Sequence, residues 1–397
     1  MLAVDDAVAR VVAACRALAA EQVALSDSLG RVLAEDIVAR LTKPPFDCSA
    51  MDGFAVRAGD VARVPATLTL IGIAHAGGSF AGSLGPGEAV RIFTGAPLPA
   101  GADTILIQEN ADLDGARVTA RVSVGAGRHV RRAGIDFRQG ERGPRAGTRM
   151  DARAIALTAA MNVPWLRVHR RPRVAILATG DEIVMPGEPV GPNQIVSANS
   201  LALTALVTEA GGVPVALGIA RDTPESLLSA MAGAAGADLV VLTGGASVGD
   251  HDLVRPVLSK AGLELDFWSI AMRPGRPLVF GTYLGVPLLG LPGNPVSTLV
   301  CGLLFVRPAI ERMQGLAESA QRLERGILGR DLAANDQRQD YLRSALVRSP
   351  DGTRVVTPFD RQDSSMLATL AEAGALAIRP PHAPAAKAGD PIAYMPL

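Results

Sequence analysis

Between residues 174 and 312 the chain alternates short apolar runs with segments of helical spacing. The apolar runs predict buried strands, because they are rich in β-branched residues and bounded by turn residues. The predicted strands are Val174–Leu177, Val213–Ile219, Leu239–Leu242, Leu263–Ile270 and Pro287–Leu291. The helical segments are Ser200–Glu209, Pro224–Ala235, Leu253–Ala261 and Val296–Arg312. This alternation predicts a mostly parallel, three-layer α/β domain with right-handed crossovers.

The rest of the chain follows different patterns and predicts a multidomain α/β protein. Residues 3–20 and Asp151–Ala160 have helical spacing. Short alternating runs between glycine-rich turns, from Ala55 to Arg138, predict an inserted β-rich module. Short strands recur after residue 337 and predict a small C-terminal β-barrel. The expected domains are 1–46 with 138–170 (a helical and extended linker domain), 47–137 (β-rich insert), 171–318 (α/β) and 319–397 (C-terminal β domain).

Composition narrows the class of protein. The chain has 397 residues and is 48% hydrophobic, so several domains with real cores are expected. A formal net charge of +0 argues against a general nucleic-acid or membrane-surface role. Three cysteines without metal-ligand spacing favour a reducing compartment. The sequence contains neither a long apolar run nor a basic N-terminus ahead of an apolar stretch, so a cytoplasmic protein is expected.

The loops after the predicted strands carry most of the candidate chemistry. They are Thr179–Glu182, Arg221–Asp222, Thr243–Asp252, Arg273–Pro277 and Pro292–Ser297. If the strands are parallel, these loops lie along one edge of the sheet, where open α/β sheets bind ligands. Glycine-rich backbone can cradle an oxyanion there. The charged residues at this edge are Asp181, Glu182, Asp222, Asp250, Asp252, Arg273 and Arg276, a set that suits a phosphate ligand carrying Mg²⁺.

Each loop alone could be a plain structural turn, but together they favour a site. No lysine lies in a P-loop pattern, and no strand is followed by G-x-G-x-x-G, so neither standard nucleotide signature is present. Outside the α/β region, Asp47 and Asp52 lie in a segment with few other polar groups, and Thr94 and Asp136 occupy turns. There the residues alone favour a plain loop at least as much as a site.

Six segments in combination resemble one known family. They are Ser49-Ala-Met-Asp-Gly-Phe-Ala55, Thr94-Gly95, Gly134-x-Asp136, Thr179-Gly-Asp-Glu182, Thr243-Gly-Gly-x-Ser-Val-Gly249 and Pro292-Gly-Asn-Pro-Val-Ser297. In this order they are similar to the molybdopterin molybdenumtransferase (MoeA) family, to which the gephyrin C-terminal region also belongs. The resemblance runs from residue 1 to the C-terminus, and the first, fifth and sixth segments are specific together.

The resemblance implies a reaction and an assembly. Members of the family insert molybdate into adenylylated molybdopterin with Mg²⁺ and release AMP. The expected protein is an elongated homodimer whose active sites are shared between the α/β domain of one subunit and the N-terminal domains of the other. An upstream adenylyltransferase and downstream molybdoenzymes are the expected protein partners, with no nucleic acid and no membrane.

The resemblance also implies site residues. The expected catalytic residues are Asp52, Thr94, Asp136, Glu182, Asp222 and Asp252, with Ser364 or Ser365 added from the last domain. The expected substrate-binding residues are Thr179, Gly180, Gly244, Gly245, Ser247, Gly249, Arg273, Arg276, Pro292, Asn294, Pro295 and Ser297. The candidate Mg²⁺ ligands are Asp181, Glu182, Asp222, Asp250 and Asp252.

Some positions depart from the family pattern. Arg273, Arg276 and Ser269 stand where relatives often have lysine, and Cys48 precedes Ser49 where asparagine is frequent. Arginine keeps the positive charge but presents it with a different geometry. Two alternatives stay open, a non-catalytic scaffold on the same fold and a pterin adenylyltransferase-like enzyme. The N-terminal acids together with Glu182 and Asp252 favour the insertase.

Overall fold

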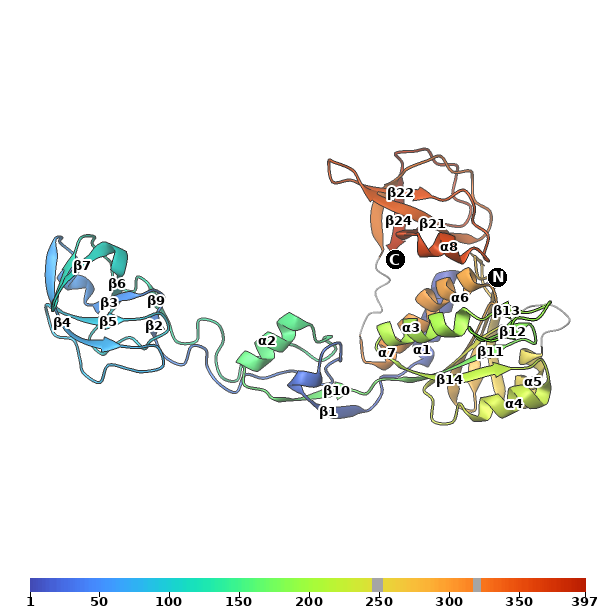
Figure 1. Ribbon diagram of the computed structural model, residues 1–397, viewed down its shortest axis with the longest axis horizontal. Coiled ribbons are helices and arrows are strands. Elements are labelled where there is room, and N and C mark those ends of the chain that lie inside the picture. The colour runs from blue at the N-terminus through green and yellow to red at the C-terminus, as the bar shows by residue number, and fades with distance from the viewer. Residues whose placement is uncertain (245–252, 317–322) are drawn as a thin grey trace.

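The molecule is elongated, with a β-rich domain at one end and two packed domains at the other (Figure 1). The computed structural model describes residues 1–244, 253–316 and 323–397. An extended connector holds the two ends apart. It contains the antiparallel pair β1 (Ala20–Ala24) and β10 (Trp165–His169), the 3₁₀ turn η1 (Leu25–Asp27) and helix α2 (Ala152–Ala160). The Asp151 side chain caps α2 by accepting a hydrogen bond from the Ala154 amide.

The α/β domain is built on a six-stranded sheet in the order β14-β11-β15-β19-β18-β16. The strands are β14 (Val213–Ala220), β11 (Arg173–Thr179), β15 (Leu239–Thr243), β19 (Val286–Leu291), β18 (Pro277–Tyr283) and β16 (Leu263–Ser269). The four strands from β14 to β19 are parallel, whereas β18 is antiparallel to both of its neighbours. The predicted mostly parallel sheet is confirmed, and the predicted strands all exist.

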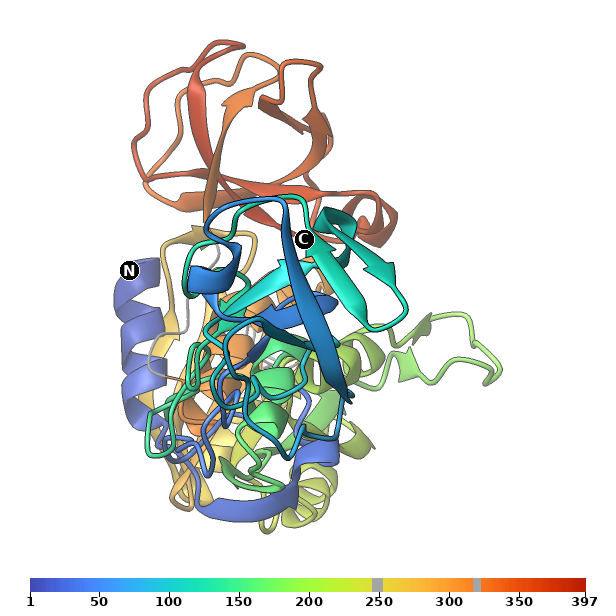
Figure 2. The same cartoon turned by 90° about the vertical axis from the view of Figure 1, so that its left-hand side faces the viewer.

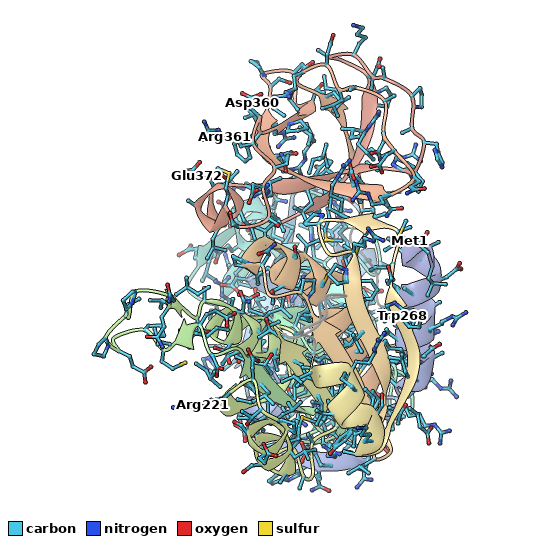
Figure 3. All side chains as sticks on the ribbon, turned by 90° about the vertical axis from the view of Figure 1, so that its right-hand side faces the viewer. Met1, Arg221, Trp268, Asp360, Arg361 and Glu372 are labelled. Atoms are coloured by element: carbon cyan, nitrogen blue, oxygen red, sulfur yellow. The ribbon has the colours of Figure 1, made fainter. Side chains whose placement is uncertain are left out.

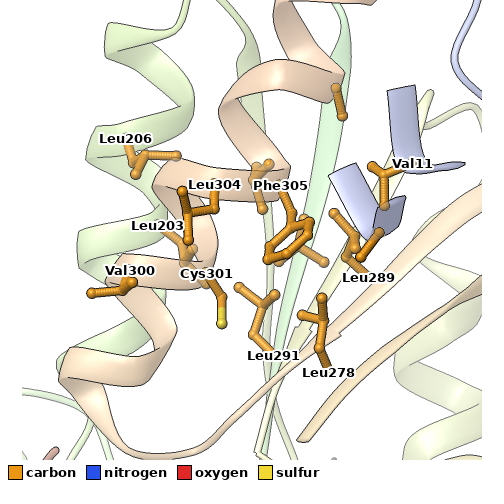
Figure 4. Close-up of a cluster of buried hydrophobic side chains, with 14 of the residues drawn as sticks. Val11, Leu203, Leu206, Leu278, Leu289, Leu291, Val300, Cys301, Leu304 and Phe305 are labelled. Carbon is orange, nitrogen blue, oxygen red and sulfur yellow. The ribbon is translucent and has the colours of Figure 1, made fainter. Parts of the chain in front are cut away.

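Helices cover both faces of this sheet, which gives the three expected layers. They are α3 (Asn199–Glu209), α4 (Pro224–Ala232), α5 (Val254–Lys260), α6 (Pro295–Cys301), the π-helical turn η4 (Gly302–Val306) and α7 (Arg307–Met313). Alternate residues of each strand point to opposite faces. Val174 and Ile176 therefore pack with α3, α6 and α7, while Ala175 and Leu177 pack with α4 and α5. Figure 4 shows part of the first core, around Phe305 and Leu291.

Two features of this domain differ from the sequence prediction. Strand β18 was not predicted, and it forms a hairpin with β19 through Leu284 and Gly285, both at positive φ. The predicted helix over residues 3–20 is shorter, α1 (Val4–Ala14). Residues 1–46 were expected in the linker domain, whereas the buried Val4, Ala7 and Val11 of this helix pack in the core of the α/β domain. The apolar face of α1 has a larger surface to bury against there.

The β-rich domain is a second six-stranded sheet, ordered β6-β3-β5-β4-β8-β7, with a core on each side. Its strands are β3 (Gly53–Val56), β4 (Ala66–Ala74), β5 (Glu88–Ile92), β6 (Thr104–Ile107), β7 (Ala111–Asp114) and β8 (Arg117–Ala120), with 3₁₀ turns η2 (Ala58–Val61) and η3 (Gln108–Asn110). The short pair β2 (Cys48–Ser49) and β9 (Val130–Arg131) closes the end nearest the connector.

The C-terminal domain is a closed five-stranded barrel, as predicted. Its strands are β20 (Glu324–Leu328), β21 (Gln339–Arg348), β22 (Arg354–Pro358), β23 (Ala375–Arg379) and β24 (Pro391–Pro396), with α8 (Leu367–Ala371) between β22 and β23. Pairing of β21 with both β22 and β23 closes the barrel. A short strand of the α/β domain, β17 (Met272–Arg273), adds to β21 and joins the two domains.

A small flap projects from the α/β domain (Figures 2 and 3). It consists of β12 (Ile183–Val184), β13 (Ile195–Val196) and the turn between them. Along the part of the chain that the structure describes, no helix is long and apolar enough to cross a membrane.

Candidate functional site

The strand order creates a switch point at the carboxyl ends of β11 and β15. From β11 the chain crosses to β14 on one side, and then returns to β15 on the other side. Open α/β sheets bind ligands at such points. Thr179 ends β11 and Thr243 ends β15, and Gly244 follows with φ +88°. A side chain at Gly244 would come within 2.4 Å of the Thr179 carbonyl oxygen, so only glycine allows the two strand ends to lie this close.

A cavity of about 430 Å³ opens at this switch point. Its described lining consists of Glu182, Ile183, Ile195, Val196, Ser197, Ala198, Asn199, Gly244, Pro277, Pro292, Gly293, Asn294 and Pro295. The expected Glu182, Gly244, Pro292, Asn294 and Pro295 therefore meet at one place. Thr179 lies against Gly244 and is 4% exposed, and its hydroxyl has no hydrogen-bond partner among the described residues. Such a buried hydroxyl is available to a ligand or water.

Asn199 holds two sides of the cavity together. Its side-chain Nδ2 donates to Thr243 Oγ1 at 3.0 Å and to the Gly293 carbonyl at 2.7 Å. The end of β15 is thereby joined to the loop after β19. Sequence reasoning missed this residue, because a single asparagine at the start of α3 has no distinctive spacing around it.

Two of the expected metal ligands face each other beside the cavity. Asp222 Oδ2 accepts a hydrogen bond from the Asp181 amide at 3.4 Å, and Asp181 Oδ1 accepts one from the Asp222 amide at 3.3 Å. Both side chains are exposed. Within residues 1–244, 253–316 and 323–397, no group of three or more metal-ligating side chains is assembled. A carboxylate pair of this kind fits Mg²⁺, which retains several waters and takes further oxygens from a bound phosphate.

The C-terminal domain reaches the cavity through the expected Ser364. Asn294 Nδ2 donates to Ser364 Oγ at 2.8 Å, and the Val296 amide donates to the Ser364 carbonyl at 3.1 Å. Ser365 instead donates its hydroxyl to Asp363 at 2.6 Å. The buried Arg343, which the sequence analysis did not single out, donates to the carbonyls of Asp363 and Met366 and so fixes this loop. Ser297 is buried in the first turn of α6.

Arg273 lies at the domain junction. Its guanidinium makes a bidentate contact with Asp340 on β21, in which Nε donates to Oδ1 at 2.9 Å and Nη2 donates to Oδ2 at 2.5 Å. A longer hydrogen bond, of 3.4 Å, goes to Asp336. Asp266 on the neighbouring strand β16 pairs with Arg10 at 2.8 Å. Arg276 is exposed in the same loop. Neither arginine is among the residues that line the cavity.

The N-terminal candidates lie apart from the cavity, on the β-rich domain and at its junction with the connector. Asp52 Oδ1 accepts hydrogen bonds from the Thr94 amide and from the Thr94 hydroxyl, both at 2.8 Å. These bonds, first the one from the amide, lower the pKa of Asp52 below its ordinary value, and Arg91 nearby adds to the effect. Asp136 lies near Lys43, with Oδ2 and Nζ 3.5 Å apart.

Asp47 holds this group in place. Its carboxylate accepts from the Ala133 amide at 2.8 Å and from Arg132 at 2.5 Å, and the same two donors lower its pKa. The segment carrying Asp47 and Asp52 is thereby joined to the turn that precedes Asp136. Asp52 and Thr94 thus lie on the β-rich domain and Asp136 at its junction with the connector, away from the α/β elements that line the cavity (Figure 1).

The remaining candidates are Gly245, Ser247, Gly249, Asp250 and Asp252, which lie outside the described residues. Gly180, at φ +142°, follows β11 directly, and a side chain there would come within 2.5 Å of the Glu182 carboxylate. Glycine at this position therefore allows Glu182 to fold back toward the end of β11.

Three family descriptions match successive parts of the chain. Residues 2–162 match "MoeA N-terminal region (domain I and II)", residues 175–312 match "Probable molybdopterin binding domain", and residues 325–397 match "MoeA C-terminal region (domain IV)". A molybdopterin molybdenumtransferase of Nostoc sp. is 38% identical over 360 residues, which cover 88% of this chain and 83% of the relative. The chain belongs to the molybdopterin molybdenumtransferase family. It is therefore a transferase of molybdenum cofactor biosynthesis.

Further relatives support the same assignment over the whole length. Molybdopterin molybdenumtransferase 1 of Mycobacterium tuberculosis is 34% identical over 416 residues, covering 98% of this chain and 97% of the relative. The crystal structure of a molybdopterin biosynthesis MoeA protein from Pyrococcus horikoshii has a TM-score of 0.85 at 26% identity, with all of both chains covered. The arrangement of the domains is thus shared with a solved structure.

Proposed function

We propose that this protein inserts molybdate into adenylylated molybdopterin and releases AMP, in a reaction that depends on Mg²⁺. The observation that carries the proposal is the cavity at the switch point. Its lining includes the backbone of Gly244 and Gly293, and Thr179 beside Gly244 carries a buried hydroxyl without a partner among the described residues. The acid pair Asp181 and Asp222 adjoins Glu182, which lines the cavity. Backbone amides and hydroxyls suit the oxygens of a pyrophosphate, and the acid pair suits the cation that accompanies it.

The roles of the residues follow from their chemistry. Gly244, Gly293 and Asn294 would hold the phosphate part of the substrate, and Thr179 would donate to it the hydroxyl that has no partner among the described residues. Asp181 and Asp222, with Glu182, would hold Mg²⁺, which as a Lewis acid would make AMP a better leaving group. Gly245, Ser247, Gly249, Asp250 and Asp252 belong to the same proposed site by their place in the sequence.

The site is proposed to be completed by a second copy of the chain. Asp52 and Thr94 lie on the β-rich domain and Asp136 at its junction with the connector, which holds this domain away from the cavity of its own chain (Figure 1). In a homodimer these residues would meet the cavity of the partner subunit. Asp52 has its proton affinity lowered by Thr94, so it would enter such a site as a carboxylate.

The decisive test is the reaction itself. Purified protein is incubated with adenylylated molybdopterin, molybdate and Mg²⁺, and the release of AMP is followed together with the formation of active cofactor. We expect both products in equal amounts, and neither product when molybdate or Mg²⁺ is left out. Binding of the substrate without AMP release under all conditions would contradict the proposal.

A further inference from the structure

The cavity at the switch point has two chemically different sides. One side carries the polar groups already described, at Asn199, Gly244 and Gly293. The other side is formed by the flap, which contributes Ile183, Ile195 and Val196. Branched aliphatic side chains offer a phosphate neither hydrogen-bond donors nor positive charge. This second side of the cavity therefore suits a different, apolar part of a ligand.

The flap leaves large aliphatic groups in contact with solvent. Ile195 is 62% exposed and Val196 is 47% exposed, although both line the cavity. Ile183 and Ile195 are paired directly across the two strands, and therefore lie on the same face of the small sheet. Covering these side chains with an apolar surface would remove them from water, which is favourable.

The flap is held in position by its own hydrogen bonds. The Ile195 amide donates to the Glu182 carbonyl at 2.7 Å, and the Ser197 amide donates to the Val184 carbonyl at 2.8 Å. In the turn, Glu188 and Gln194 accept from the amides of Met185 and Gly191, respectively. The apolar side is thus formed before a ligand arrives, and little ordering is needed on binding.

Proline rings add to the apolar character of the cavity. Pro277, Pro292 and Pro295 line it from β18 and from the loop after β19. A planar ring fits between aliphatic side chains and proline rings, because it is apolar on both faces and polar only at its edges. Charged or strongly hydrated groups would lose water there without gaining hydrogen bonds.

We propose that Ile183 and Ile195 form the binding wall for a planar heteroaromatic ring, while the phosphate of the same ligand lies on the glycine side. The inference deepens the proposed function and rests on it, since that substrate carries an adenine ring and a pterin ring. The wall would set the orientation of the substrate, and Ile195, as its most exposed member, would contribute most to ring affinity.

Calorimetric titration of the full-length protein in Mg²⁺ buffer tests the wall. The probes are AMP, neopterin monophosphate and inorganic pyrophosphate. Ile195→Ser should weaken binding of a ring-bearing probe by about fivefold to tenfold, because a buried aliphatic contact is lost, and should leave pyrophosphate affinity within about twofold. Ile195→Val should retain most of the affinity. Whichever of AMP and neopterin monophosphate loses affinity identifies the ring.

Val190 provides a matched control. It is a β-branched residue on the same flap, 53% exposed, and lies outside the cavity lining, so Val190→Ser should change no affinity. Unchanged binding of both ring-bearing probes by Ile195→Ser, or an equal loss for pyrophosphate, would overturn the wall while leaving the proposed function intact. A wild-type protein that binds none of the three probes would instead count against the proposed function itself.

Discussion

At the scale of single residues, Asp52 is held by two hydrogen bonds from Thr94 in an exposed turn. These hydrogen bonds orient the carboxylate but leave it exposed to solvent. Its charge is therefore expected to contribute more to ligand binding than to the stability of the fold. Asp52→Asn should lower cofactor formation at least about tenfold, roughly 1.4 kcal/mol in the barrier. The unfolding free energy should change by no more than about 0.5 kcal/mol. Steady-state assays and thermal unfolding measure the two effects.

A second aspartate of the same domain controls this experiment. Asp112 is exposed and only 3.6 Å from Arg121, and it lies on β7 away from Thr94. Asp112→Asn should leave cofactor formation at the wild-type level. Full activity in Asp52→Asn would remove Asp52 from the proposed site.

Arg273 leads to a different expectation, because its partner Asp340 is only 7% exposed at the side chain while Arg273 itself is 46% exposed. Arg273→Ala would leave a nearly buried carboxylate without its guanidinium. Discounted for the solvent around the arginine, the cost in unfolding free energy should be about 1 to 3 kcal/mol. AMP affinity should stay within about twofold of the wild-type value. Chemical denaturation and calorimetry separate the two effects.

Arg276→Ala is the matched control for stability, since Arg276 is exposed in the same loop, and it should change the unfolding free energy by less than about 0.5 kcal/mol. A large loss of AMP affinity in Arg273→Ala with unchanged stability would contradict this expectation and indicate that Arg273 contacts the ligand.

The residues of the cavity were predictable from sequence only where a local pattern marked them. Thr179 ends a strand, Gly244 and Asn294 follow strands within recognisable turns, and the structure brings them together. Asn199 and Arg343 were not predicted, because each is a single polar residue within a helix or strand and belongs to no recognisable motif. The contact of Arg273 with Asp340 spans two domains, and no local spacing encodes it.

At the scale of elements, the junction formed by β17 and β21 should respond to acid. Arg338, by side-chain and backbone hydrogen bonds, lowers the pKa of Asp336 from 3.8 to about 2, and Arg273 adds to this. A carboxyl with a depressed folded-state pKa stabilises the fold above its unfolded pKa, near 3.8, and the stabilisation is lost as pH falls toward about 2. The stability difference between wild type and Asp336→Asn should therefore shrink over this pH range, as measured by urea unfolding. A difference independent of pH would contradict this assignment.

Helix α1 provides a test of its place in the α/β core. Val11 is fully buried there, and Val11→Ala removes the equivalent of two methylene groups. At ~0.8 kcal/mol each, the α/β domain should lose about 1.5 to 2 kcal/mol of unfolding free energy. Val12→Ala, at a partly buried position one residue on, should cost less. Equal losses at both positions would show that α1 does not pack as described.

The elements that the sequence predicted best are those with strong local periodicity. The parallel strands and the helices α3, α4, α6 and α7 were all expected, within a few residues at their ends. Strand β18 was overlooked because its apolar run follows a proline-rich loop and adjoins another strand through Leu284-Gly285, which is a weak turn signal. The location of α1 depends on contacts with residues nearly 300 positions away, such as Phe305, which no local pattern records.

At the scale of the whole molecule, a site shared between subunits predicts complementation. Asp52→Asn and Glu182→Gln proteins are each expected to be inactive. After subunit exchange, a heterodimer has one site carrying both changes and one carrying neither. Random exchange should restore about a quarter of the wild-type activity, since half of the dimers would be mixed and each would have one intact site. Mixtures as inactive as their parents, with exchange verified by tagged subunits, would contradict a shared site.

The packing of α1 on the α/β core has a consequence for biosynthesis. The helix ends at Ala14, whereas the strand that begins the sheet starts at Arg173. Translation proceeds from the N-terminus, so the β-rich domain can fold on the ribosome while α1 still has no surface to cover its apolar face. Val4, Ala7 and Val11 are buried only when the segment through Met313 has emerged. Helix α1 is therefore synthesised well before the surface that buries it, and until that surface has formed its apolar face is open to binding by chaperones.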